Sequence, residues 1–256
     1  PVRYIYQDNQ GAYGARNTGL YHATGKYIAF YDSDDLWLPH HLKDCVEGLE
    51  ANPDVDWVYG ACRMVDHATG EVLAASTFYV QGKPRPSLKM DSRIVGDLSI
   101  IEDLRVAECQ VLHGLFCGLQ NSVVRHAVFQ SQRIPPFRVG EDQALVIKCL
   151  IAGFQFAFIN RIHVVYRIHE QSTSGGTMDD PKAIQAIIQS VIDAHESLLQ
   201  SRSIDGRLLY ALRRRLMQEY FWKLGYATLW VNGQRAEALQ MFRRGLHYWP
   251  WDWRCW

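Results

Sequence analysis

The sequence has no long hydrophobic run, no net charge and no closely spaced cysteine pair. Its most apolar stretch, FQFAFINRIHVVY, contains Asn160, Arg161 and His163, which excludes a transmembrane helix. The 27 basic and 27 acidic residues cancel, whereas chains dedicated to nucleic acid usually carry a basic excess, so we expect no nucleic-acid partner. The opening residues, PVRYIYQDNQ, lack the basic start and apolar core of a signal peptide. Together these absences predict a cytoplasmic protein.

The six cysteines are scattered and have mostly apolar neighbours. Because no two of them form a C-x-x-C pair, reduced thiols in a cytosolic core explain them better than a disulfide framework or a zinc site. They are Cys45, Cys62, Cys109, Cys117, Cys149 and Cys255.

Charge and tryptophan are unevenly distributed along the 256 residues. Residues 201–256 hold ten basic and four acidic side chains, a local charge of +6, so residues 1–200 must sum to −6. Six of the eight tryptophans also lie in residues 201–256. The overall content of 48% hydrophobic residues is ample for a buried core and excludes disorder as the dominant state. The chain therefore has an acidic part and a basic, aromatic part.

The first two-thirds of the chain alternate β-type runs with helical patterns. We predict strands at residues 2–6, 27–31 and 57–65, a short helix at residues 15–23, and a second helix from Leu42 that ends before Asn52. A turn at residues 67–70 would lead into a partner strand, and residues 82–92 are expected to form a loop. Strands separated by helices predict an α/β fold with a sheet rich in parallel pairs.

From Pro181 the apolar residues follow a helical period. Residues 221–250 predict a helix, an Asn232-Gly233 turn and a second helix, in a spacing that resembles one tetratricopeptide-like hairpin. One hairpin cannot bury its own apolar face, so we expect it to pack on the α/β domain; a partner-binding repeat is the alternative. We therefore expect two regions, residues 1–175 and residues 176–256.

An acidic cluster, Asp32-Ser-Asp-Asp35, directly follows the apolar run at residues 27–31. Three carboxylates repel one another unless a cation lies among them, and strand ends are where open α/β sheets bind ligands. Closely spaced oxygen ligands suit Mg²⁺ or Mn²⁺. The alternative is a solvated acidic turn before the next helix, and spacing alone does not decide between the two.

The segment NQGAYGARNTGLYHATGKYIAFYDSDDLWLPHHL resembles the middle of the family 2 glycosyltransferases, whose pattern there is N-x-G-x-x-x-A-R-N-x-G, a strand and D-x-D-D-x-W-x-P. A second match runs from Gly140-Glu-Asp142 through a helix to Tyr166-Arg-Ile-His169 and residues 172–174. The resemblance covers residues 1 to about 175. It implies a GT-A fold with a Rossmann-like mixed sheet. It also implies an enzyme that moves a sugar from a nucleotide-sugar to a hydroxyl with inversion.

The same resemblance implies a metal-dependent donor site. It places Mn²⁺ or Mg²⁺ on Asp34, with Asp32 and His169 as further metal ligands and Asp35 in support. Such a cation neutralises the diphosphate as the glycosidic bond breaks. The side chains implied to face the metal or the donor nucleotide are Arg16, Asn17, Asp32, Asp34, Arg167 and His169.

On the acceptor side, the resemblance makes Asp142 the general base that takes the proton of the attacking hydroxyl. Glu141 would orient the acceptor, and burial with nearby negative charge would raise the pKa of Asp142. Without the family context, both residues also fit an ordinary acidic helix start. His40 and His41 lie at the start of the helix predicted before Asn52 and are expected to be solvated. Trp37 is expected to be a packing residue.

Members of this family usually begin with a strand ending P-x-Y-N and a second strand followed by D-D-G-S, which bind the base and ribose. Neither pattern is present here. We therefore expect the sequence to be a fragment that lacks the first strands of the fold.

The expected donor is a UDP-, GDP- or dTDP-linked sugar, and the expected acceptor is a saccharide or a lipid-linked molecule in polysaccharide or glycoconjugate synthesis. Basic residues interleaved with tryptophan in residues 201–256 suit an anionic surface and predict peripheral association with the inner face of the membrane. Two other functions stay open: a sugar nucleotidyltransferase, whose usual glycine-rich loop after the first strand is absent here, and a non-catalytic scaffold of GT-A type.

Overall fold

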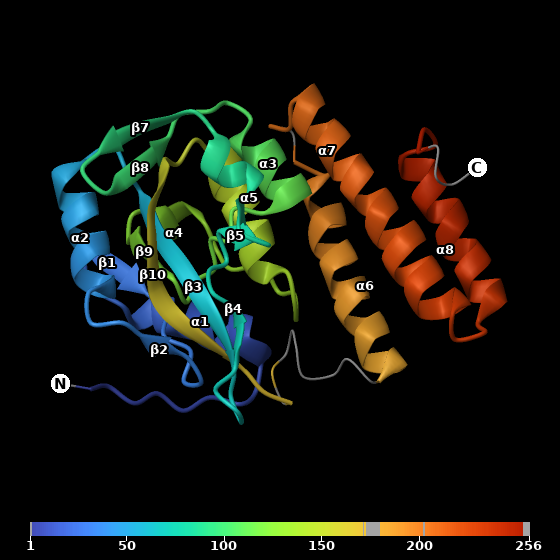
Figure 1. The fold of residues 1–256 in the computed structure, drawn as a ribbon, viewed down its shortest axis with the longest axis horizontal. Coiled ribbons are helices and arrows are strands. Elements are labelled where there is room, and N and C mark those ends of the chain that lie inside the picture. The colour runs from blue at the N-terminus through green and yellow to red at the C-terminus, as the bar shows by residue number, and fades with distance from the viewer. Residues whose placement is uncertain (1, 171, 173–179, 202, 253–256) are drawn as a thin grey trace.

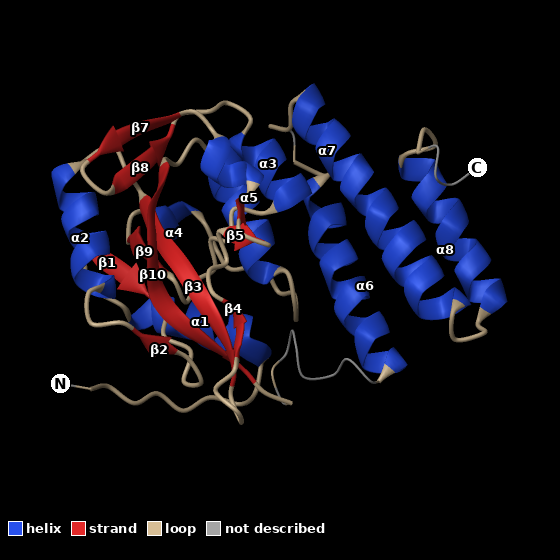
Figure 2. Cartoon of the chain, viewed as in Figure 1, coloured by secondary structure: helices blue, strands red, loops and turns tan. Residues whose placement is uncertain are grey.

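The computed structural model describes residues 2–170, 172, 180–201 and 203–252. A mixed sheet with its helices occupies one part of the chain, and the C-terminal helices stand beside it (Figures 1 and 2). Within the described residues, no helix combines the length and the hydropathy needed to cross a membrane.

In the described residues the main sheet has eight strands, in the hydrogen-bonded order β1-β9-β3-β10-β8-β7, with β2 on β10 and β4 on β3. Among the described strand pairs only β3 and β10 run parallel. The predicted excess of parallel pairs is therefore wrong, because β9 and β8 flank the parallel pair and run antiparallel to it. The spacing of apolar residues along the sequence carries no information on strand direction. The strands are β1 (Tyr27–Ala29), β2 (Leu36–Trp37), β3 (Trp57–Asp66), β4 (Val72–Ala74), β7 (Ser92–Val95), β8 (Leu98–Ile101), β9 (Ser122–Arg125) and β10 (Phe156–Ile168).

Strand β3 is buried on both faces and divides the core into two layers. Trp57 packs with Leu145 of α5 (Glu141–Ile151), and its ring stacks on Phe156 at 5.0 Å between centroids. Val58 points to the other face and packs with Leu49 of α2 (His41–Ala51). Side chains alternate across a strand, so a strand buried on both sides reads as a continuous apolar run. The remaining helices of this part are α1 (Gly11–His22), α3 (Val106–His113) and α4 (Val128–Ser131).

Several predicted elements are confirmed and one is wrong. Helix α2 ends before Asn52, and β3 turns at residues 67–70 into β4. The strand predicted at residues 2–6 is absent, because no described strand pairs with it and the side chains of Val2, Tyr4 and Tyr6 are exposed. The predicted loop at residues 82–92 includes β6 (Lys83–Pro84), paired with β5 (Tyr79–Val80), and a short 3₁₀ helix, η1 (Pro86–Lys89).

The C-terminal helices form as the period predicts. They are α6 (Pro181–Leu198), α7 (Gly206–Met217), the π-helical segment η2 (Gln218–Trp230) and α8 (Arg235–Tyr248). The side chains of Asp180 and Asp205 cap α6 and α7 by accepting backbone N–H bonds. Leu208 and Leu212 of α7 join Ile147 of α5 in one apolar cluster, so these helices pack on the α/β part. The boundary between residues 1–175 and 176–256 as separate domains stays a prediction.

Candidate functional site

A cavity of about 940 Å³ opens between α1, the end of β1 and the start of α5. Its lining brings together two acidic segments that are far apart in the sequence. The charged residues on its wall are Arg16, Asp32, Asp34, Arg138, Glu141 and Asp142. Four of the five carboxylates singled out in the sequence therefore share one cavity, and Asp35 is buried behind it.

The acidic loop is held in place on both sides. The backbone N–H of Asp35 donates to the carbonyl of Asp32 at 3.1 Å, and the Tyr31 hydroxyl donates to the Asp35 carbonyl at 2.9 Å. After the loop, the Trp37 indole N–H donates to the Gln120 carbonyl at 2.8 Å while its ring meets Tyr31 edge-on. Trp37 therefore packs and anchors the loop, as expected.

Arg16 on α1 connects the two acidic segments. One guanidinium nitrogen donates to both oxygens of Asp32, at 3.0 and 3.2 Å, and the other donates to Glu141 at 2.8 Å. Arginine is suited to such paired contacts because its planar fork matches a carboxylate. Only 17% of the Arg16 side chain is exposed, so these are partly buried ion pairs of the cavity wall. Through these ion pairs, Arg16 holds the carboxylates of Glu141 and Asp32 in position.

The end of β10 fastens the loop from the opposite side. The Arg167 side chain donates to the Asp34 carbonyl, and its backbone N–H donates to an Asp35 carboxylate oxygen at 3.1 Å. His169 Nε2 lies 3.1 Å from Asp34 Oδ2. The carboxylate of Asp34 and the imidazole of His169 thus face each other at the partly exposed rim of the loop.

This donor set fits a divalent cation in part. A carboxylate and an imidazole suit Mn²⁺, and an ion of this kind usually completes its shell with phosphate oxygens and water. In the described part of the chain, the sets of three ligand atoms within 4.8 Å of one another do not contain Asp32, Asp34 or His169. Asp32 contacts Arg16, and Asp34 lies beside His169, so a metal at this loop would meet Asp34 and His169 first.

Two carboxyl groups begin helix α5. Burial, reinforced by the neighbouring Asp142, raises the pKa of Glu141 against the opposing charge of Arg16. Burial also raises the pKa of Asp142, while the Gln143 N–H and Arg16 oppose the rise. A raised pKa makes a carboxylate a stronger proton acceptor, and perturbed carboxyl groups in a cavity are typical of functional sites.

The start of α5 is supported by helix α6. Gly140, which precedes the acidic pair, has a φ of +90°, and an added Cβ would lie 3.4 Å from the Cβ of Ala194. The Ser190 hydroxyl donates to the Val139 carbonyl at 2.9 Å and accepts from its N–H at 3.0 Å. The C-terminal helices therefore help to position Glu141 and Asp142.

Asp35 is the most perturbed carboxyl group of the loop. Burial, with added repulsion from Asp32 and Asp34, raises its pKa to about 7 against the opposing hydrogen bond from Arg167. Its side chain is fully buried, and within the described residues its Oδ2 has no hydrogen-bond partner. Near neutral pH Asp35 is therefore only partly charged, which reduces repulsion within the loop.

The other sequence-predicted residues lie at or near this wall. Asn17 donates to the Ile134 carbonyl at 2.9 Å and accepts from its N–H at 3.2 Å, so it holds the chain before α5; its contact with a nucleotide stays a prediction. Ser172 lines the cavity, whereas residues 173–174 lie outside the described residues. Sequence reasoning did not single out Gln120, which also lines the cavity, because it lies in no recognisable motif.

The chain is similar to known glycosyltransferases. The family model described as Glycosyl transferase family 2 matches residues 1–101. The succinoglycan biosynthesis protein ExoO of Rhizobium meliloti (strain 1021) is 26% identical over 224 residues, which are 84% of this chain and 57% of that protein. The UDP-Glc:alpha-D-GlcNAc-diphosphoundecaprenol beta-1,3-glucosyltransferase WfaP of Escherichia coli is 25% identical over 194 residues, 74% of this chain and 65% of that protein. The chain thus spans less than two thirds of the length of these relatives.

A solved structure supports the fold. The crystal structure of S. aureus TarS 1-349 in complex with UDP-GlcNAc superimposes with a TM-score of 0.57 at 14% identity, covering 94% of this chain and 62% of that chain. This likeness shows a mixed sheet of GT-A type with a helical C-terminal region. With the family model that matches residues 1–101 and the similar relatives, it leads to one conclusion: the chain is similar to the glycosyltransferases of family 2 and has a fold of their GT-A type.

Proposed function

We propose that the chain is an inverting, metal-dependent glycosyltransferase that moves a sugar from a nucleotide-sugar donor to a hydroxyl acceptor. The observation that carries this proposal is the shared cavity, whose wall holds Asp34 from the loop after β1 and Asp142 from the start of α5. Asp34 would act on the leaving group through the cation, and Asp142 would act on the attacking hydroxyl.

On the donor side, Asp34 and His169 would hold the cation beside the diphosphate. A bound Mn²⁺ or Mg²⁺ would supply Lewis-acid stabilisation of the departing nucleoside diphosphate. Asp32, held by Arg16, lies on the same wall and is in place to accept a hydrogen bond from the ribose. The Arg167 side chain donates to the Asp34 carbonyl and so holds the backbone of Asp34 in position.

On the acceptor side, Asp142 takes the proton of the acceptor hydroxyl as its oxygen attacks the anomeric carbon. The new C–O bond forms while the bond from that carbon to the diphosphate breaks, and the nucleoside diphosphate leaves. Glu141, fixed by Arg16, is positioned to accept a hydrogen bond from the acceptor sugar. The raised pKa of Asp142 suits it to this proton transfer.

The proposal predicts donor turnover that depends on a divalent cation. The protein is incubated with UDP-, GDP- and dTDP-sugars in the presence of Mn²⁺ or Mg²⁺, and the released nucleoside diphosphate is measured. We expect release from one nucleotide class, with UDP-sugars first because WfaP is named for UDP-Glc, and loss of release when EDTA is added. Release of pyrophosphate from a sugar phosphate and a nucleoside triphosphate would point to a nucleotidyltransferase, and no turnover of any donor would favour a scaffold.

We further propose a lipid-linked acceptor presented at an anionic membrane. WfaP is named for a sugar acceptor on diphosphoundecaprenol. In the C-terminal region, Trp230 at the end of η2 is 37% exposed and Trp251, which follows α8, is 78% exposed. Arg213, Arg214 and Arg243 are exposed on α7 and α8. Arginine with exposed tryptophan is suited to the surface of an anionic bilayer.

These exposed arginine and tryptophan side chains predict salt-sensitive membrane binding. The protein should co-sediment with vesicles that contain anionic lipid, bind less as ionic strength rises, and bind weakly to neutral vesicles. Arg213→Glu combined with Arg214→Glu should reduce binding, whereas Lys43→Glu, at an exposed position of helix α2 in the other region, should not. Equal sedimentation with neutral and anionic vesicles would contradict the proposal.

A further inference from the structure

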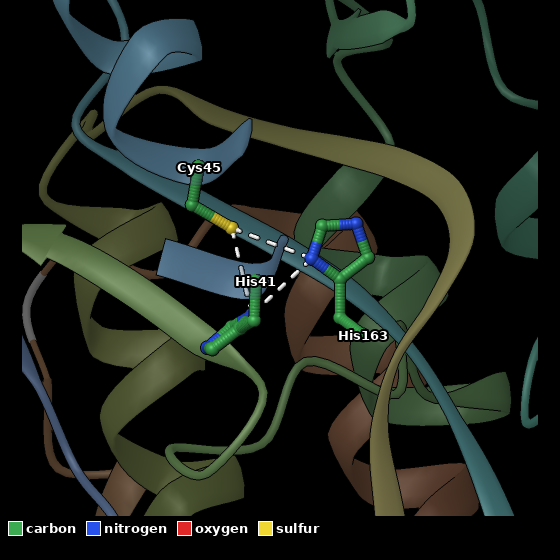
Figure 3. A group of neighbouring side chains, drawn as sticks. All are labelled: His41, Cys45 and His163. Carbon is green, nitrogen blue, oxygen red and sulfur yellow. Dashed lines mark hydrogen bonds between the residues drawn. The ribbon is translucent and has the colours of Figure 1, made fainter. Parts of the chain in front are cut away.

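A second cluster of chemically active side chains lies outside the cavity. His41 and Cys45 on α2 converge with His163 on β10 (Figure 3). His41 Nδ1 and His163 Nδ1 are 3.2 Å apart, and Cys45 Sγ lies 3.8 Å from each of them. All three side chains are fully buried. The expectation that His41 is solvated is therefore wrong, because the first turn of α2 faces the sheet.

We propose that His41, Cys45 and His163 bind a Zn²⁺ ion through the two Nδ1 atoms and the thiolate. On binding, the Cys45 thiol would release its proton to solvent as the sulfur–zinc bond forms. The fourth position of the ion would be taken by water. None of the three side chains lines the cavity of the proposed sugar transfer.

The separations of the three ligand atoms fit tetrahedral zinc. With Zn–N of about 2.0 Å and Zn–S of about 2.3 Å, a tetrahedral ion places two nitrogens about 3.3 Å apart and a nitrogen and a sulfur about 3.5 Å apart. The separations here are 3.2 Å for the nitrogens and 3.8 Å for each nitrogen to the sulfur. The ligand atoms therefore lie close to the distances that a shared zinc ion would impose.

The fold builds this arrangement from three separate features. His41 and Cys45 are four residues apart on α2, which places them on one face of the helix. Strand β10 shifts its register against β3 between Ile159 and Ile162 and again between Ile162 and Val164, and His163 lies within this irregularity. On β3, Gly60 leaves room for the His163 ring, because a Cβ at Gly60 would lie 2.3 Å from His163 Cγ.

Hydrogen bonds within this cluster involve only one nitrogen of each buried imidazole. Within the described residues, Nε2 of both His41 and His163 is buried with no hydrogen-bond partner. Burying a polar group costs free energy unless it is paired or coordinates a metal. Coordination through both Nδ1 atoms would stabilise the two buried rings, and each Nε2 would keep its hydrogen.

A carboxylate is in place to support the site. Asp44 Oδ2 lies 4.0 Å from His163 Nε2, on the ring edge opposite the ligand atom. Histidines bound to zinc commonly donate their other N–H to a carboxylate, which fixes the ring and adds negative charge. With one thiolate and two neutral imidazoles around a doubly charged ion, Asp44 would balance part of the remaining charge.

The proposed zinc would brace the acidic loop from behind. The His163 carbonyl accepts the N–H of Leu38 at 2.9 Å. The Trp37 ring packs against His41 at 4.9 Å between centroids. Both Trp37 and Leu38 directly follow the loop that carries Asp34. Zinc would therefore fix α2 to β10 at the base of this loop.

Metal content tests the proposal directly. The full chain, loaded with Zn²⁺ and dialysed, should hold about one zinc per chain by elemental analysis. Cys45→Ser and His163→Ala should each lose most of it and lower the melting temperature measured with zinc present. Cys149→Ser is the matched control, since Cys149 is equally buried on α5 and lies in a different core cluster. Asp34→Ala should keep its zinc, which separates this site from the proposed sugar-transfer site.

A measurement on the unmodified chain keeps the test independent of variant folding. Co²⁺ in place of zinc should give the visible bands of a tetrahedral complex and a near-ultraviolet thiolate-to-cobalt band. The proposal is overturned if the loaded wild-type chain holds no zinc. It is also overturned if the cobalt complex of that chain lacks the thiolate-to-cobalt band. Zinc content in Cys45→Ser equal to that in Cys149→Ser would overturn it as well.

Discussion

Asp142→Asn is expected to lower kcat for sugar transfer by a factor of about 10² to 10⁴, the usual contribution of a positioned general base. The amide keeps the size and shape of the side chain but cannot accept the proton of the acceptor hydroxyl. Initial rates of nucleoside diphosphate release, with donor and acceptor saturating, provide the measurement. Donor KM should change little, because Asp142 acts on the acceptor.

The pH profile gives this prediction a second readout. The pKa of Asp142 is raised, so the group is protonated and inactive as a base at low pH, and the rate should rise as pH increases through that pKa. The midpoint should lie above that of an ordinary aspartate, and Asp142→Asn should lose this acidic limb. Asp193→Asn, an exposed carboxylate on α6, is the control and should keep both rate and profile. Full activity in Asp142→Asn would remove Asp142 from the mechanism.

Asp34→Ala is expected to lower kcat/KM by at least about 10², because a metal ion contributes several kcal/mol to the stabilisation of a charged leaving group. The variant loses one side of the Asp34–His169 pair, so half-saturation of activity should require a much higher concentration of Mn²⁺. A titration of activity with Mn²⁺ measures both effects.

The control for this experiment is Asp97→Ala, which removes an exposed carboxylate in the turn between β7 and β8 and should leave the titration unchanged. A rate in Asp34→Ala that still equals the wild-type rate at every Mn²⁺ concentration would show that the metal, if used, is held elsewhere.

Helical and extended segments with strong periodicity could be predicted from the sequence, and the directions of the strands could not. Helix α2 and strand β3 follow from local pattern, because each buries one face or both faces in a regular register. The positions of β8 and β9 beside the parallel pair depend on long-range pairing, which local period does not encode. The apolar residues 2–6 have strand character but no described partner, and a strand needs one to form.

The residues of the candidate site could largely be predicted from the sequence, whereas the contacts between them could not. The residues of the acidic loop and of the start of α5 carry motifs, and the structure places them in one cavity. The ion pairs of Arg16 with Asp32 and Glu141 join segments that no spacing rule relates. The cluster of His41, Cys45 and His163 was missed for the same reason, since its third member lies on a distant strand.

The anomeric configuration of the product tests most directly the central claim, a single displacement in which Asp142 deprotonates the acceptor. The measurement is a nuclear magnetic resonance spectrum of the glycoside formed from an α-linked nucleotide-sugar, recorded before the product can equilibrate. The account predicts a β-linked product, because direct in-line attack inverts the anomeric carbon. An α-linked product would mean retention, and would contradict both the single displacement and the role of Asp142.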